Sequence, residues 1–149
     1  VFYLGYLDIV MYHEPTDTFT IIDIKTSTNG WKDYAKKDEE KQFQLILYKK
    51  YFAEQFDVPE ESISVEFLIV RRKVYTEGEY PQKRVQEFSP PSGKIKIARA
   101  TKAVNEFIEE CFEGSTYTDK IMEPNASKWN CTFCAYKDNP KLCGLGVNL

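Results

Sequence analysis

An acid and an amine, Asp23 and Lys25, stand two residues apart in the otherwise apolar segment Phe19–Lys25. Alternate side chains of a β-strand share a face, so we expect these two to point to one side of the strand and Ile22 and Ile24 to the other. Charged groups in an apolar strand are costly unless they are paired or used in chemistry. Taken alone, this pattern favours a structural ion pair over a catalytic site.

A second carboxylate, Asp8, lies in the preceding apolar segment Val1–Tyr12. We expect this segment to form a hairpin with Phe19–Lys25 across the turn residues Glu14–Asp17. Carboxylates from neighbouring strands can bind one hard cation, and oxygen ligands suit Mg²⁺ or Mn²⁺, with water and phosphate as further ligands. Beside such a cation, Lys25 could hold or deprotonate a water, or stabilise charge that develops on a phosphate.

Two polar residues, Gln44 and Tyr48, stand four residues apart in the segment Asp38–Phe56. That segment contains neither Pro nor Gly, and its apolar residues recur at helical spacing, which predicts a helix. A four-residue step places both side chains on one helix face, one turn apart. They could bind the substrate backbone or orient Lys25. The alternative is an ordinary surface Gln next to a half-buried Tyr.

In order and spacing, three motifs resemble the RecB-like branch of the PD-(D/E)XK nuclease superfamily, which includes CRISPR-associated and phage exonucleases: Gly5-Tyr6-Leu7-Asp8, Asp23-Ile24-Lys25, and Gln44 to Tyr48. The resemblance implies a restriction-endonuclease-like α/β core with a mixed central sheet flanked by helices. It also implies a role for each motif residue: Asp8, Asp23 and the Ile24 carbonyl as metal ligands, Lys25 as the catalytic lysine, and Gln44 and Tyr48 beside the active site.

The activity that the resemblance implies is Mg²⁺- or Mn²⁺-dependent hydrolysis of phosphodiester bonds in DNA, with exonuclease-like action on single-stranded ends. The family core also has a preceding helix that supplies a Glu or His to the site. This sequence shows no such helix, and its lone histidine, His13, follows Asp8 on the hairpin. We therefore expect an N-terminal helical part to be missing. The alternative function is a catalytically incomplete nuclease fold that acts as a DNA-binding or assembly module.

Three of the four cysteines lie in an irregular tail, residues 113–149: Cys131 and Cys134 form a C-x-x-C pair, and Cys143 follows. Without a signal peptide, this arrangement favours metal ligation over a disulfide framework. The resemblance implies a [4Fe–4S] cluster, with Cys111 as a candidate fourth ligand, although its place on an apolar helix face favours a buried thiol. Zn²⁺ and the absence of any metal are alternatives. In the weakest interpretation, the chain is a small cysteine-cluster protein whose charged strand residues are structural.

The elements that must position these residues follow from the rest of the pattern. Ile63–Val70 and Val85–Phe88 are typical of strands, and Ile95–Phe112 of a second helix. The order strand, strand, helix, strand, strand, helix predicts a sheet covered by helices, of the α/β or α+β class. We expect a single nuclease-like domain over residues 1–149, with residues 1–112 as its core.

Composition supports a globular domain, with 149 residues of which 42% are hydrophobic and 29% charged. No apolar run is long enough to span a membrane. The resemblance and the lack of a signal peptide predict a cytoplasmic protein, and the branch includes phage members, so a phage or viral source is a further expectation.

Charge is distributed unevenly along the chain. The net charge of −3 argues against binding nucleic acid through bulk charge, but residues 71–102 carry nine basic residues against three acidic ones. We expect Arg71, Arg72 and Lys73 in this strip to contact nucleic acid, and Trp31, which is followed by several lysines, to stack on a single strand. The alternatives are a solvated mixed surface and a packing tryptophan.

Overall fold

The computed structural model of the chain describes residues 4–77, 79–113, 116–117, 127–137, 139 and 143. The chain divides into two compact units, residues 1–109 and 110–149. The first unit contains the sheet and every residue of the expected active site, whereas all four cysteines fall in the second. Within the described parts, none of the helices has the length and apolar character needed to cross a membrane.

The first two strands form the expected antiparallel hairpin: β1 (Ile9–His13) and β2 (Thr18–Ser27) are joined by a short 3-10 turn, Glu14–Thr16. Asp17 ends the turn with φ of +50°, in the left-handed region that Asp tolerates better than most residues. The side chain of Tyr12 stabilises the turn, because its hydroxyl donates a hydrogen bond of 3.0 Å to Oδ1 of Asp17.

The predicted strand Val1–Tyr12 is wrong at its start. β1 begins at Ile9, residues 4–7 have no strand pairing, and residues 1–3 lie outside the described part of the chain. Where the strand pairing stops, the side chain of Asp8 accepts the hydrogen bond from the backbone N–H of Ile24, at 2.8 Å. The Asp8 side chain thus takes the place of a backbone acceptor from the neighbouring strand. The apolar composition of the segment does not reveal this.

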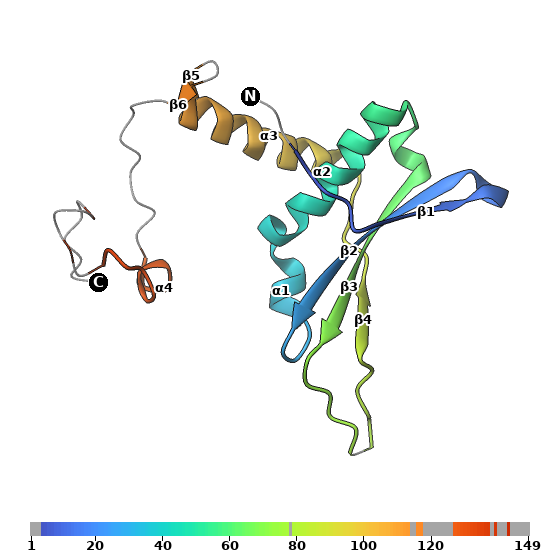
Figure 1. The fold of residues 1–149 in the computed structure, drawn as a ribbon, viewed down its shortest axis with the longest axis horizontal. Helices are drawn as coiled ribbons and strands as arrows, with labels where there is room; N and C mark the ends of the chain where they lie inside the picture. The colour runs from blue at the N-terminus through green and yellow to red at the C-terminus, as the bar shows by residue number, and fades with distance from the viewer. Residues whose placement is uncertain are drawn as a thin grey trace. The chain divides into compact units, whose positions relative to one another are not determined.

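The sheet is mixed and has the order β1-β2-β3-β4. β3 (Ile63–Arg71) runs parallel to β2, and β4 (Val85–Phe88) runs antiparallel to β3. Parallel neighbours need a crossover connection, and the helix α2 (Glu39–Phe56) provides it between β2 and β3 (Figure 1). The predicted mixed sheet with flanking helices is therefore confirmed.

Helix α2 is buried on two sides. One side packs on the sheet, where Leu45, Tyr48 and Phe52 meet Ile21, Val65, Phe67 and Ile69. The other side packs on α3 (Lys94–Cys111), where Ile46 and Leu47 meet Ile97 and Ala100. The layers of the first unit are therefore sheet, α2 and α3, with α2 in the middle (Figure 1).

Most predicted boundaries agree with the structure to within one or two residues, and Val85–Phe88 agrees fully. The sequence did not predict α1 (Asp33–Lys37), a single turn before α2, since five residues are too few to show a helical period. In the second unit the described elements are short: β5 (Phe112–Glu113) pairs with β6 (Thr116–Tyr117), and α4 covers Lys128–Cys131.

Candidate active site

The two expected metal-binding carboxylates lie on neighbouring chain segments of the β1–β2 hairpin. Ile9 pairs with Ile22, and continuing this register by one residue places Asp8 opposite Asp23. Opposed residues of an antiparallel pair have their side chains on the same face, with Cβ atoms about 5 Å apart. The hydrogen bond from the Ile24 N–H fixes Oδ2 of Asp8 at 2.8 Å from that nitrogen. The structure thus brings Asp8, Asp23 and the backbone of Ile24 together.

Asp23 is a buried carboxylate with too few partners. Its residue is 3% exposed, because it points to the face of the sheet that α2 covers. Its Oδ2 atom lies 2.8 Å from Nζ of Lys25, yet it accepts no hydrogen bond. One ion-pair contact does not replace the hydration that a buried carboxylate loses. Asp23 is therefore suited to bind a further cation, and Asp8 stands opposite to share it.

Lys25 is held from two sides. Its Nζ contacts Asp23 and donates a hydrogen bond of 2.9 Å to Oε1 of Gln44, which comes from α2. The amide nitrogen of Gln44 in turn donates to the hydroxyl of Tyr48 at 2.8 Å. An ammonium group has three N–H donors and Gln44 accepts only one of them, so Lys25 keeps donor capacity for a ligand. The helical pair Gln44 and Tyr48 is therefore joined to Lys25 by hydrogen bonds, and its role in orienting the lysine stays a prediction.

Gly5 is required by the ring of Tyr48. A Cβ atom on Gly5 would lie 2.7 Å from Cε1 and 3.3 Å from Cδ1 of that ring. The ring cannot move aside easily, since Tyr48 is 8% exposed and belongs to the core under the sheet. Gly5 thus lets the chain before Asp8 pack directly against the ring of Tyr48, whose hydroxyl accepts a hydrogen bond from Gln44.

Trp31 packs against the edge of the core. Its ring centroid lies 5.0 Å from that of Phe67 and 6.4 Å from that of Phe88. Gln86 holds its backbone from β4, accepting from the Trp31 N–H at 2.8 Å and donating to the Trp31 carbonyl at 3.0 Å. This placement matches the packing alternative, and stacking of Trp31 on a single strand stays a prediction.

Sequence reasoning missed Gln86. It pairs with Ile69 of β3, which pairs with Lys25, so it lies in the same row of the sheet. The available signal was the polar Gln86 next to Val85 in a predicted strand. Gly30, with φ of +84°, allows the close approach, since a Cβ there would lie 2.8 Å from Oε1 of Gln86.

The three basic residues of the predicted nucleic-acid interface begin at the end of β3. Arg71 turns inward: its Nε is buried without a hydrogen bond, and Nη1 donates to the carbonyl of Lys83 at 2.8 Å. Arg72 and Lys73 are exposed. The structure therefore gives Arg71 a structural contact and leaves its two neighbours accessible to a ligand.

The cysteines give no metal site among the described residues. Cys111, Cys131, Cys134 and Cys143 are all half-buried and free of disulfides. In the parts of the chain that are described, no three His, Cys, Asp or Glu side chains are grouped to hold a metal ion. The pair Asp8 and Asp23 does not depend on such a group, because a backbone carbonyl, water and phosphate would complete it.

Comparison with known proteins agrees with this geometry. A model of the PD-(D/E)XK nuclease superfamily matches residues 4–139, a range that includes the hairpin, both long helices and two of the tail cysteines. No significant match was found among curated proteins or among solved structures. The matched superfamily consists of nucleases, so DNA is the expected class of substrate. With a match over most of its length and with the acidic and lysine side chains gathered on the hairpin, the chain belongs to the PD-(D/E)XK nuclease superfamily.

Proposed function

We propose that this protein is a Mg²⁺- or Mn²⁺-dependent deoxyribonuclease that hydrolyses phosphodiester bonds at the Asp8–Asp23–Lys25 site. The observation that carries the proposal is the buried, under-partnered carboxylate of Asp23 between Asp8 and Lys25. A buried acid in that condition weakens the fold, and a function at this position explains why the chain keeps it. The superfamily match supplies the class of reaction.

The donors present fit a divalent cation. Carboxylate oxygens of Asp8 and Asp23, with the Ile24 carbonyl, would hold it, and these are hard oxygen ligands of the kind that Mg²⁺ and Mn²⁺ prefer. When bound, such a cation polarises a phosphate oxygen and lowers the pKa of a water molecule. Oδ1 of Asp8 is available to bind the cation, because the Ile24 N–H donates to Oδ2.

Lys25 supplies a positive charge at the reacting phosphate. In this proposal its free N–H donates to a non-bridging phosphate oxygen, where negative charge grows as water attacks in line with the leaving oxygen. Preorganised donors of this kind typically contribute about 10²–10³-fold to the rate. Gln44 and Tyr48 are positioning residues: Gln44 accepts a hydrogen bond from Lys25 and donates one to Tyr48, so both act on the substrate through the lysine.

We further propose exonuclease-like action on single-stranded ends and membership of the RecB-like branch. The support is the order of the motifs and the helical pair Gln44 and Tyr48, which the structure joins to Lys25. A cytoplasmic location, and a phage or viral source, are proposals that rest on the resemblance alone.

The test is a cleavage assay on single- and double-stranded DNA, with and without free ends, in Mg²⁺, Mn²⁺ and EDTA. We expect metal-dependent cleavage of linear single strands, and circular single strands distinguish exonuclease from endonuclease action. Binding without cleavage in any metal would overturn the enzymatic proposal and favour the alternative, a DNA-binding or assembly module.

A [4Fe–4S] cluster on Cys131, Cys134, Cys143 and Cys111, with Zn²⁺ as the alternative, stays a prediction. The donor type fits either metal, and all four thiols lie in the unit of residues 110–149. We derive no catalytic step from it. Visible absorption and metal content of anaerobically purified protein decide between iron–sulfur, zinc and no metal.

A further inference from the structure

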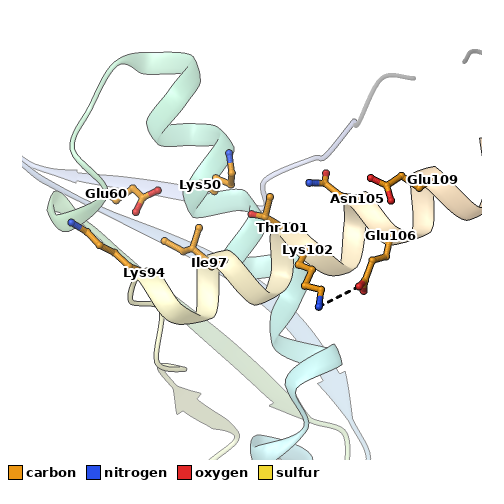
Figure 2. A pocket seen from close by; sticks show the side chains of 10 residues that line it. Lys50, Glu60, Lys94, Ile97, Thr101, Lys102, Asn105, Glu106 and Glu109 are labelled. Carbon is orange, nitrogen blue, oxygen red and sulfur yellow. Dashed lines mark ion pairs between the residues drawn. The ribbon is translucent and has the colours of Figure 1, made fainter.

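The basic residues of positions 71–102 fall into two groups with different surroundings. The four on α3 each have an acidic partner. Lys94 lies 3.2 Å from Glu61, Lys102 lies 3.4 Å from Glu106, and Lys96 and Arg99 both contact Glu39. Figure 2 shows the Lys102–Glu106 pair on the wall of a cavity of about 730 Å³ that also contains Glu60 and Glu109. The charge of this helix is therefore locally balanced.

The other five basic residues lie on residues 71–84, which comprise the last residue of β3 and the link to β4 and which we call the β3–β4 arm. It is described except for residue 78, and it projects beyond the sheet (Figure 1). The arm has five basic and two acidic residues. Among the described residues none of the five forms an ion pair, so the positive charge of the arm is not neutralised.

Hydrogen bonds order the arm without cancelling its charge. Arg71 donates to the carbonyl of Lys83 at 2.8 Å, and Arg84 donates to the carbonyl of Arg71 at 2.9 Å. Further along, the N–H of Gln82 donates to the carbonyl of Tyr75 at 2.9 Å. The two guanidinium groups thus join the two sides of the arm, and Lys73 and Lys83 keep exposed ammonium groups.

The base of the arm is fixed next to the candidate active site. The N–H groups of Arg72 and Lys73 donate to the carbonyls of Ser27 and Thr28 at the end of β2, at 2.8 and 2.9 Å. In the sheet register Lys25 pairs with Ile69, two residues before the arm begins. Two residues of a strand span about 7 Å, so a polymer bound along the arm can reach Lys25.

Two aromatic side chains of the arm are exposed. Tyr75 is 60% exposed and Tyr80 is 84% exposed, and neither has a ring contact with another described residue. Aromatic rings among unpaired basic groups are the combination that binds single-stranded nucleic acid, because bases stack on the rings while the cations contact phosphates. Duplex DNA would leave both rings without stacking partners.

We propose that the β3–β4 arm binds single-stranded DNA, with bases stacked on Tyr75 and Tyr80 and phosphates held by Lys73 and Lys83. The bound strand leads into the Asp8–Asp23–Lys25 site. The choice of DNA rests on the proposed nuclease function, whereas the choice of a single strand rests on the exposed rings. Helix α3, which contributes the other four basic residues, takes no part.

The first test compares Tyr75→Ala/Tyr80→Ala with Tyr75→Phe/Tyr80→Phe in the full chain. Binding of a fluorescent oligothymidine is measured in EDTA, so that cleavage does not interfere. We expect the alanine variant to bind at least about tenfold more weakly per lost base stack and the phenylalanine variant to bind normally. An oligonucleotide of abasic sites should bind both variants equally. Equal affinity of the alanine variant and the unmodified protein for oligothymidine would overturn the proposal.

The second test measures how much the positive charge of the arm contributes to binding. Lys73→Gln/Lys83→Gln removes two unpaired cations, and the control Lys94→Gln/Lys102→Gln removes two that are paired. Each single-strand phosphate contact contributes about 0.7 to the slope of log affinity against log salt. We expect the arm variant to lose about 1.4 of that slope and the control to lose little. Equal losses would show that the arm is not the binding surface.

The outcomes separate this inference from the nuclease proposal. Cleavage by the unmodified protein with normal binding by the arm variants would contradict only the proposal that the arm binds DNA. Arm-dependent binding without cleavage in any metal would contradict the nuclease alone. A preference for single-stranded RNA, or for a protein, over oligothymidine would overturn the choice of DNA.

Discussion

The candidate active site and the α2–α3 interface both contain charged side chains, but they differ in how far neighbouring groups compensate those charges. In the site, Asp23 is almost fully buried and has one ion-pair contact and no hydrogen bond to Oδ2. At the interface, Glu39 has two cationic partners, Lys96 and Arg99, and remains partly exposed. The charge of Glu39 is compensated by its neighbours. In the site and on the β3–β4 arm the compensation is incomplete, and there we infer that the chain retains charge for a ligand.

The largest expected effect is that of Asp23→Asn. Cleavage should be abolished, while the melting temperature in EDTA should hold or rise, since the substitution removes repulsion from Asp8 and a poorly satisfied buried charge. Mg²⁺ or Mn²⁺ should raise the melting temperature of the unmodified protein but not of the variant, because a cation that binds only the folded state stabilises it.

Glu39→Gln is the matched control for that experiment. It also removes one carboxylate, but from the compensated region, and it should keep cleavage and the metal-dependent stabilisation. If Asp23→Asn cleaved normally, or if Glu39→Gln lost cleavage to the same degree, the contrast between the two regions would be wrong.

The next largest effect is that of Gly5→Ala. The added methyl overlaps the buried Tyr48 ring, at 2.7 Å from Cε1, so the free energy of unfolding should fall by about 1–3 kcal/mol. Single-turnover cleavage should fall as well, because a displaced Tyr48 releases Gln44 and Lys25. Gly93→Ala is the control, since a Cβ there meets nothing within 4 Å. Urea unfolding of both variants checks the prediction, and equal stabilities would refute the contact.

A smaller effect is expected for Lys49, which is 7% exposed on α2 and lies 3.5 Å from Oγ of Ser92. Burial lowers the pKa of Lys49 below its ordinary value, although Glu60 and Glu61 oppose the shift. Lys49→Met should therefore stabilise the fold by about 1 kcal/mol, or roughly 2–4 °C in melting temperature, without changing cleavage.

The pH dependence of the same residue has a definite sign. Because folded Lys49 has the lower pKa, the unfolded chain binds more protons between the two pKa values, and stability rises with pH in that range. Lys49→Met should lack this rise. Melting curves through the alkaline range up to the ordinary lysine pKa measure it, and identical pH profiles for the two proteins would contradict the burial argument.

The smallest effect concerns the contribution of Glu39 to stability at low pH. Hydrogen bonding to Lys96 lowers the pKa of Glu39, so its contribution to stability is present above the ordinary Glu pKa and is lost as the pH falls through the lowered value. Glu39→Gln should melt slightly below the unmodified protein at neutral pH and together with it in strong acid. A difference that persisted in acid would point to lost packing instead.

Much of the fold and the composition of the site could be predicted from local patterns. Periods of two and of three to four residues locate β2, β3, β4, α2 and α3, and the same periods place Asp23 with Lys25 and Gln44 with Tyr48. Asp8 was predicted for its chemistry, but the hydrogen bond that its carboxylate accepts from the Ile24 N–H depends on where a strand stops pairing.

What could not be predicted depends on contacts between distant segments. Glu39 compensates Lys96 and Arg99 from 57 and 60 residues away, so the count of basic residues did not show which charges are neutralised. Trp31 was expected at a nucleic-acid interface, but the rings of Phe67 and Phe88, which pack against it, come from two later strands. The need for glycine at position 5 depends on Tyr48 in the same way.

The central claim is that Lys25 acts on the substrate and does not merely pair with Asp23. It is tested most directly by single-turnover cleavage and melting temperature of Lys25→Ala in saturating Mn²⁺. The control is Lys50→Ala, which loses the ion pair with Glu54 on α2. We predict an unchanged melting temperature, because the cation still neutralises Asp23, and turnover reduced by about 10²–10³-fold. A destabilised Lys25→Ala protein with near-normal turnover would contradict the account and reduce the pair to a structural one.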